Sequence, residues 1–237
     1  MLPRAVFFDL DDTLLDGYSA MQAAWAIVCA DFGPRLGVAP DVLRDTIRRE
    51  ATAFWKDEEA VGHWRVRLQD ARTHVIELAL RAEGLDATLA EPLSQAYGAE
   101  HRAHLRPFGD AFETLEAVRA AGLNTALITN GPRELQRDKI ERFDVARYMD
   151  AIVIEGEFGR GKPSPEVFVH ALSEVGAEAP GAWMVGDNLY ADVGGAKAVG
   201  LHAIWIHRER LAPREDIPAV PDRVIAHLAE LRAALDL

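Results

Sequence analysis

Residues 4–14 read Arg-Ala-Val-Phe-Phe-Asp-Leu-Asp-Asp-Thr-Leu, a short apolar run that leads directly into carboxylates. Residues 4–8 are rich in β-branched and aromatic side chains and lack polar alternation, which is typical of a buried strand in a parallel sheet. Asp9 and Asp11 come at the end of that strand. Because the carboxyl-end loops of an open parallel sheet gather around one crevice, this stretch predicts an α/β fold and the place of its site.

From residue 107 onward, helix-like and strand-like segments alternate along the chain. Strands are expected at 125–129, 151–154, 183–185 and 202–206, and helices at 111–121, from Pro132, from Pro165, at 190–199 and at 222–235. This alternation implies a parallel, Rossmann-like sheet covered by helices on both faces, and the segment 4–8 completes that sheet.

Residues 17–106 are instead helical almost throughout. A first apolar stripe begins at Tyr18 and is expected to stop at Gly33-Pro34, and three further stripes begin near Leu43, Leu68 and Leu89. Four amphipathic helices with short connections fit a small bundle. The expected organisation is therefore an α/β core made of residues 1–16 and 107–237, with a helical domain inserted at residues 17–106.

Polar residues also follow the later strands, namely Thr129, Asn130 and Gly131 after one and Asp187 after another, with Lys162 and Asp192 nearby in the chain. Asp9 and Asp11 are two residues apart, so their carboxylates point the same way on extended chain. Asp187 and Asp192 would make the crevice strongly negative, and like charges this close need a counter-charge. A hard divalent cation meets that need, and magnesium is the usual one beside phosphate.

The same crevice has groups suited to an anion. Lys162 supplies positive charge, and the Thr129 hydroxyl and backbone N–H groups near Asn130 and Gly131 can donate hydrogen bonds. The helix expected to open at Pro132 directs its N-terminus at the same place, where an anion is favoured. Together these groups predict a phosphate site next to a metal site.

Four motifs carry a family resemblance, and they occur in the family's order. Asp9-Leu-Asp-Asp-Thr-Leu14, Leu127-Ile-Thr-Asn-Gly131, Lys162 within Gly161–Pro165, and Gly186-Asp-Asn-Leu-Tyr-Ala-Asp192 resemble the motifs of the haloacid dehalogenase-like (HAD) superfamily. The resemblance covers 1–16 and 107–237. The insertion is similar only in general character to the helical cap domain of one large subgroup.

The resemblance implies roles for individual residues. Asp9 would be the nucleophile that forms an aspartyl-phosphate, and Asp11 the general acid and base. Mg²⁺ would be held by the Asp9 side chain, the Asp11 backbone carbonyl and Asp187, with Asp192 supporting the metal or orienting Lys162. Substrate would be bound by Thr13, Thr129, Asn130, Gly131 and Lys162. Thr129 and Lys162 would also stabilise charge on the transferring group, so Lys162 counts as catalytic too.

The implied function is a magnesium-dependent phosphatase that hydrolyses small phosphorylated metabolites. The insertion and residues 190–197 are loosely similar to sugar-phosphate and nucleotide phosphatases of the superfamily, including the N-acylneuraminate-9-phosphatases. His63-Trp64-Arg65 in the insertion is a candidate to line a substrate pocket.

Other functions remain open at this stage. C–halogen hydrolysis needs neither a metal nor an acid at position 11. A sugar phosphomutase would use the same motifs and return the phosphoryl group to a sugar. Phosphonate cleavage needs a lysine in the insertion, and Lys56 is the only one there. A non-enzymatic phosphometabolite-binding protein fits least well, because the nucleophile and acid positions are both filled.

The composition of the chain limits the possible partners and the location of the protein. The formal net charge of −12 disfavours nucleic acid, since an acidic surface repels phosphate backbones. One cysteine, Cys29, cannot form an internal disulfide, and the N-terminal apolar run is too short for a signal peptide or a membrane span. We expect a cytoplasmic protein, a monomer or a homodimer, whose partner is a small phosphorylated substrate.

Overall fold

The computed structural model describes residues 3–56, 64–208 and 219–237. The chain divides into two compact units, one formed by Met1–Asp16 with Pro107–Leu237 and the other by Gly17–Arg106. The first unit is an α/β core, and the second is built of helices. None of the helices in the described ranges combines the length and the apolar character that a membrane span requires.

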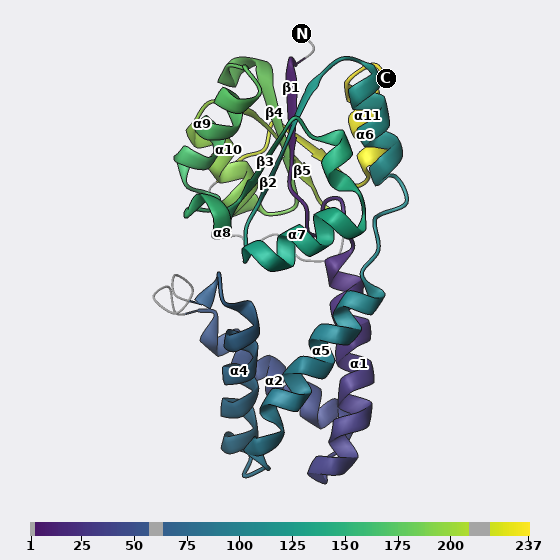
Figure 1. Cartoon of the computed structure of the whole chain (residues 1–237), viewed down its shortest axis with the longest axis vertical. Coiled ribbons are helices and arrows are strands. Elements are labelled where there is room, and N and C mark those ends of the chain that lie inside the picture. The colour runs from purple at the N-terminus through teal and green to yellow at the C-terminus, as the bar shows by residue number, and fades with distance from the viewer. Residues whose placement is uncertain (1–2, 57–63, 209–218) are drawn as a thin grey trace. The chain divides into compact units, whose positions relative to one another are not determined.

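The core holds a six-stranded sheet in the order β3-β2-β1-β4-β5-β6, and every neighbouring pair is parallel (Figure 1). Its strands are β1 (Ala5–Phe8), β2 (Asn124–Thr129), β3 (Ala151–Ile154), β4 (Ala182–Gly186), β5 (His202–Ile206) and β6 (Arg223–Ile225). The expected parallel α/β fold is confirmed. β1 lies between β2 and β4, so the chain order diverges on either side of it.

Side-chain alternation along β1 explains how both faces of the sheet become buried. Ala5 and Phe7 join the core packed against helices α9 (Pro165–Glu174) and α10 (Gly195–Ala198). Val6 and Phe8 therefore face the opposite side, since successive residues of a strand point to opposite faces. Helices α6 (Ala111–Ala120) and α11 (Leu228–Ala234) lie on that side (Figure 1).

Further elements connect the strands and helices of the chain. After β2 comes α7 (Arg133–Arg142), whose preceding residue Pro132 is its N-cap rather than its first residue, and after β3 comes α8 (Glu155–Phe158). Single 3₁₀ turns occur at Ala87–Leu89, Val145–Tyr148 and Ala179–Gly181.

Two expectations for the core differ in detail from the structure. The helix expected over 222–235 starts only at Leu228, because residues 223–225 form the edge strand β6, where only Ile225 is buried. Three residues are too few to show a strand period, so pairing with β5 decides their conformation. The helix expected over 190–199 is present, but its first part, Leu189–Gly194, is a wide π-helical turn, and α10 follows it directly.

The helical unit contains α1 (Gly17–Leu36), α2 (Pro40–Phe54), α4 (Leu68–Ala82) and α5 (Ala90–His104). Its core is formed by residues from all four, including Val28, Phe32, Leu43, Ile47, Ile76, Leu80, Leu93 and Tyr97. Apolar residues of each helix therefore face one another. The stripe expected from Leu68 is only partly confirmed, because Ala71 and Val75 are buried whereas Leu78 is exposed, and Ile76, Ala79 and Leu80 line the core.

The expected stop of α1 at Gly33-Pro34 was wrong, since the helix continues to Leu36. Pro34 lies in the last turn, where its missing N–H removes a single helical bond. The helix ends at Gly37, whose φ of +72° suits a residue without a Cβ. The N–H of Val38 donates to the Gly33 carbonyl at 3.0 Å and closes the end.

Candidate active site

Asp9 lies directly after β1, at the point where the sheet order diverges. Its N–H donates to the Val185 carbonyl at 3.0 Å, so the strand pairing with β4 continues one residue further. The Asp9 side chain is consequently buried at the carboxyl edge of the sheet, where open α/β sheets bind ligands.

Lys162 brings the buried acidic residues together. Its Nζ lies 2.5 Å from Asp9 Oδ1 and 2.6 Å from Asp192 Oδ1. Lys162 is 2% exposed and Asp192 1%, so neither charge is solvated by bulk water. Burial by itself lowers the pKa of Lys162, but the charges of Asp192 and Asp9 outweigh it and the net pKa is raised. The lysine is therefore a permanent cation in the site.

Asn130 holds the backbone of Lys162 in place. Its Nδ2 donates to the Lys162 carbonyl at 2.8 Å, and its Oδ1 accepts from the Lys162 N–H at 2.7 Å. The Asn130 side-chain amide therefore pairs with the Lys162 backbone in the way that the peptide groups of two neighbouring strands pair. Asn130 was predicted to bind substrate, and that role stays a prediction, since both of its side-chain groups are used here.

The spacing between Gly186 and Asp192 has a physical cause. The Asp192 carboxylate packs on Gly186, where an added Cβ would lie 2.3 Å from the carboxylate carbon and from Oδ2. The Asn188 N–H donates to Asp192 Oδ2 at 2.9 Å, and Asn188 Oδ1 caps the N–H groups of Tyr190 and Ala191. The wide turn after β4 thus returns Asp192 to the strand end beside Asp187.

Asp9, Asp187 and Asp192 form a cluster in which one ligand atom from each lies within 4.8 Å of the others. Burial raises the pKa of Asp9 to about 7, Lys162 opposes the rise, and the charges of Asp192 and Asp11 add to it. Burial likewise raises the pKa of Asp187 well above its usual range, with further contributions from Asp9 and Asp192. One lysine does not neutralise three carboxylates, so this oxygen donor set fits a hard divalent cation.

Asp11 points to helix α7, which the sequence did not reveal. Lys139 Nζ lies 2.8 and 2.7 Å from the two carboxylate oxygens of Asp11, and Gln136 Nε2 lies 3.0 Å from Oδ2. Gln136 Nε2 is also within hydrogen-bonding distance of Thr129 Oγ1, at 2.5 Å, and of the Asn130 carbonyl, at 3.0 Å. The available signal was their three-residue spacing, which places both side chains on one face of a helix after the second motif.

The polar groups of Gly131 and Thr13 are less accessible to a substrate. Gly131 has a φ of +118°, and its N–H donates to the buried Glu155 Oε2 at 2.9 Å. A phosphate could use this N–H only by replacing Glu155. Thr13 is fully buried, and its hydroxyl has no hydrogen-bond partner within the described ranges. Substrate contacts by these two residues stay predictions.

The structure therefore brings Asp9, Lys162, Asp187 and Asp192 together, and places Asp11 with α7. The candidate pocket residues His63-Trp64-Arg65 belong to the insertion, in a different part of the sequence. There, Trp64 stacks on His74 with ring centroids 5.6 Å apart, whereas His63 lies outside the described residues.

A buried Asp–Lys–Asp arrangement lies at the carboxyl edge of a Rossmann-like sheet, and a helical unit is inserted after the first strand, an organisation that fits an α/β hydrolase. Residues 3–200 match the haloacid dehalogenase-like hydrolase family model, and the chain belongs to that family. It is an enzyme, and the resemblance of its four motifs is thereby confirmed.

Curated relatives cover almost the whole chain. It is 34% identical to a phosphoserine phosphatase of Thermus thermophilus, covering 96% of this chain and 97% of the relative. It is 29% identical to human N-acylneuraminate-9-phosphatase, covering 98% and 93%. The relatives are phosphatases, enzymes that act on phosphoric monoesters.

A solved structure shares the fold. A HAD-type hydrolase of Bacillus subtilis superposes with a TM-score of 0.80 at 21% identity, with full coverage of both chains. At this identity the likeness supports the architecture alone.

Proposed function

We propose that the protein is a magnesium-dependent phosphatase that hydrolyses small phosphorylated metabolites through an aspartyl-phosphate on Asp9. The observation that carries the proposal is the ion-paired group of Asp9, Lys162 and Asp192 beside Asp187. This arrangement supplies a buried carboxylate nucleophile, a fixed cation for a transferring phosphoryl group, and a donor set for a metal.

In the first step, an Asp9 carboxylate oxygen attacks phosphorus, and the bond from phosphorus to the leaving oxygen breaks. Asp11 gives its proton to that oxygen, so the product leaves as an alcohol. The Lys162 ammonium, already 2.5 Å from Asp9 Oδ1, stabilises negative charge on the phosphoryl oxygens as they approach.

In the second step, the Asp11 carboxylate takes a proton from water, and the resulting hydroxide attacks the phosphorus of the aspartyl-phosphate. The bond between phosphorus and Asp9 breaks, inorganic phosphate leaves, and the Asp9 carboxylate is restored. Asp11 ends the cycle protonated, ready for the next leaving group.

Asp9, Asp187 and Asp192 are the side chains that would hold Mg²⁺, with the Asp11 carbonyl as a further oxygen ligand. When bound, the cation neutralises charge among the carboxylates and on the phosphoryl group. In this proposal Asp192 both contributes to the metal site and orients Lys162. One of its carboxylate oxygens pairs with Lys162, and the other accepts a hydrogen bond from the Asn188 N–H.

The substrate class is supported by the relatives, which are phosphatases for phosphoserine and for N-acylneuraminate 9-phosphate by name. We propose a small phosphomonoester as the substrate, and a cap-domain role for the helical unit. A cytoplasmic location and a monomeric or homodimeric state complete the proposal.

Competing reactions have less support. A dehalogenase has no use for the acid at Asp11 or for the three-carboxylate cluster. Phosphonate cleavage through a Schiff base needs a buried lysine, whereas Lys56 is exposed. A phosphomutase differs only in its product, which is a sugar phosphate in place of inorganic phosphate.

The test is a panel of phosphorylated metabolites, including phosphoserine and sugar phosphates, assayed for inorganic phosphate with Mg²⁺ and with a chelator. We expect release that depends on Mg²⁺ and returns when Mg²⁺ is restored. Halide release from 2-haloacids without metal would establish the dehalogenase alternative. Inertness toward the whole panel would instead favour a binding protein.

A further inference from the structure

Two side chains of α7 contact Asp11 but take no part in the proposed steps of phosphoryl transfer. Lys139 Nζ reaches both oxygens of the carboxylate, and Gln136 Nε2 reaches Oδ2. The Lys139 side chain is 13% exposed and Gln136 is 2% exposed. Long polar side chains are rarely buried to this extent without partners, so the contact with Asp11 is a built feature of the site.

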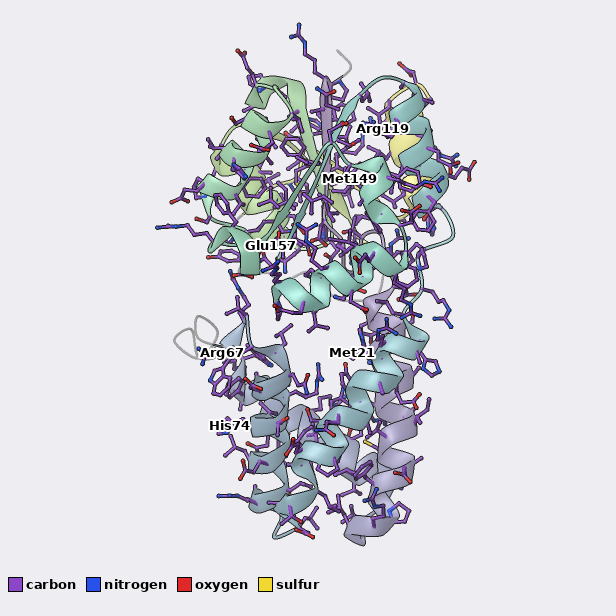
Figure 2. The ribbon with its side chains drawn as sticks, in the orientation of Figure 1. Met21, Arg67, His74, Arg119, Met149 and Glu157 are labelled. Carbon is purple, nitrogen blue, oxygen red and sulfur yellow. The ribbon has the colours of Figure 1, made fainter. Side chains whose placement is uncertain are left out.

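Helix α7 is itself fixed to the core. Arg137 forms a two-bond ion pair with Glu157 of α8 at 2.7 and 2.6 Å, and Arg133 lies 3.5 Å from the same carboxylate. Figure 2 shows Glu157 at the end of α7 nearest α8. Gln136 adds contacts to Thr129 and Asn130 at the end of β2. A helix held at these points presents Lys139 in a defined position.

The geometry constrains how Asp11 is oriented. Two nitrogens from one helix face approach its carboxylate and hold the rotamer and the plane of the group. When Asp11 carries its proton, Oδ2 can still accept from Gln136 and Lys139, which leaves the proton on Oδ1 for the leaving oxygen. Without them, Asp11 would follow a loop in which the next residue, Asp12, has a φ of +59°. Proton transfer needs the acid within hydrogen-bonding distance of the leaving oxygen, so orientation limits the rate.

We propose that Gln136 and Lys139 are positioning residues for Asp11, and that they set the efficiency of proton transfer to the leaving group. The inference rests on the proposed function, in which Asp11 is the acid. It assigns a task to α7 that is separate from phosphoryl stabilisation by Lys162.

Leaving groups distinguish positioning of the acid from any general effect on the site. An alkyl phosphate needs a proton on its departing oxygen, whereas 2,4-dinitrophenolate is a stable anion that leaves without one. A defect confined to Asp11 should therefore slow an alkyl phosphate and spare 2,4-dinitrophenyl phosphate. Loss of folding, of metal or of phosphoryl binding should slow both substrates alike.

The variant is Lys139→Met, which keeps the length of the side chain and a good helix propensity. Lys197→Met is the matched control, because Lys197 pairs with Asp222 by bonds of 2.8 and 2.9 Å and is 41% exposed at the side chain. Formation rates of the aspartyl-phosphate are measured by rapid quench for both substrates with Mg²⁺. We expect a loss of about 10–100-fold on the alkyl phosphate and less than about threefold on the dinitrophenyl ester.

A second variant tests the charge if Lys139→Met folds poorly. Lys139→Cys can be alkylated with 2-bromoethylamine to restore an ammonium at the same length. Cys29 is buried, and burial raises the pKa of its thiol to about 11, so the introduced thiol reacts preferentially. We expect alkylation to recover at least about half of the lost alkyl phosphate rate.

The outcomes separate the two proposals. Equal losses on both substrates in Lys139→Met, or no recovery after alkylation, would overturn the positioning role while leaving the phosphatase proposal intact. If the wild-type enzyme forms no aspartyl-phosphate from either substrate, the proposed function fails and the inference fails with it.

Discussion

The Lys162 ammonium lies buried between Asp9 and Asp192, so its direction depends on the backbone that carries it. That backbone is held by a single side chain, Asn130, through two bonds of 2.8 and 2.7 Å. The short motifs make Asp9 and Lys162 recognisable from sequence, because Asp9 directly follows a strand and Lys162 comes shortly before a helix. Asn130 was also singled out, but its partner lies 32 residues away, and only the fold reveals that pairing.

Asp9→Asn should abolish turnover, with a loss on the order of 10⁴-fold or more, since an amide cannot form the phosphoryl intermediate. The variant should remain folded, because Lys162 keeps its ion pair with Asp192. Without metal its unfolding temperature should equal or exceed that of the wild type, as a buried carboxylate with a raised pKa is removed. Phosphate release and thermal unfolding are measured together, and retained turnover would rule out the covalent mechanism.

Asn130→Ala should lower kcat about 10-fold or more by releasing the Lys162 backbone, at a cost in stability of about 1–3 kcal/mol. Asn124→Ala is the control, because Asn124 Nδ2 donates to the Val175 carbonyl at 2.8 Å, at the opposite end of β2. We expect the control to lose stability and keep its kcat. Equal kcat in the two variants would show that the Asn130 clamp does not affect catalysis.

At the scale of elements, the turn after β4 determines the acidic cluster. An ordinary helix was expected over 190–199, and residue periodicity could not distinguish it from the wide turn at Leu189–Gly194. The difference arises from tertiary contacts: Asp192 rests on Gly186, and Gly195 approaches the Phe168 ring so closely that a Cβ would lie 2.5 Å away. Edge strand β6 was missed for a similar reason, since β5 supplies the bonds that define it.

Gly186→Ala tests this turn, because the new methyl group would overlap the Asp192 carboxylate. We expect a loss of more than about 2 kcal/mol in unfolding free energy, together with weaker Mg²⁺ binding and lower activity, as Asp192 is displaced. Gly181→Ala, just before β4, is the control. There the nearest atom to an added Cβ is Arg4 Cγ at 4.0 Å, so both properties should be retained. Wild-type Mg²⁺ affinity in Gly186→Ala, measured by calorimetry, would contradict this account.

At the scale of the molecule, the site is assembled from distant parts of the chain. β1 precedes the helical unit, while its partners β2 and β4 follow it, and the ion pair of Asp9 with Lys162 joins residues 153 positions apart. The order of motifs predicted this convergence, because carboxyl ends of parallel strands share one edge. The contact of α7 with Asp11 could not be predicted in this way, since Gln136 and Lys139 are ordinary residues for a helix surface.

We expect the convergence of carboxylates to couple stability to pH and to the proposed metal. In the metal-free protein, the pKa of Asp9 rises from 3.8 to about 7 on folding, chiefly through burial, and that of Asp187 also rises. A carboxyl group whose pKa is raised by folding favours the folded state while it is protonated. Its contribution is complete below pH 4 and is lost as the pH rises through about 7, where the folded protein must hold buried charges.

Bound Mg²⁺ should reverse that loss, because it binds the ionised carboxylates. We therefore expect the Mg²⁺-induced rise in unfolding temperature, at one fixed Mg²⁺ concentration, to be larger at pH 8 than at pH 5.5. At 100 times the dissociation constant for pH 8, the rise at pH 8 should reach about 5–10 °C. Because the rise is the difference between the unfolding temperatures with and without Mg²⁺, the contributions of groups that titrate elsewhere cancel. Asp187→Asn, which lacks one carboxylate of the cluster, should show a much smaller rise at both pH values. An equal rise at pH 5.5 and pH 8 in the wild type would mean that protons and metal do not compete at Asp9 and Asp187.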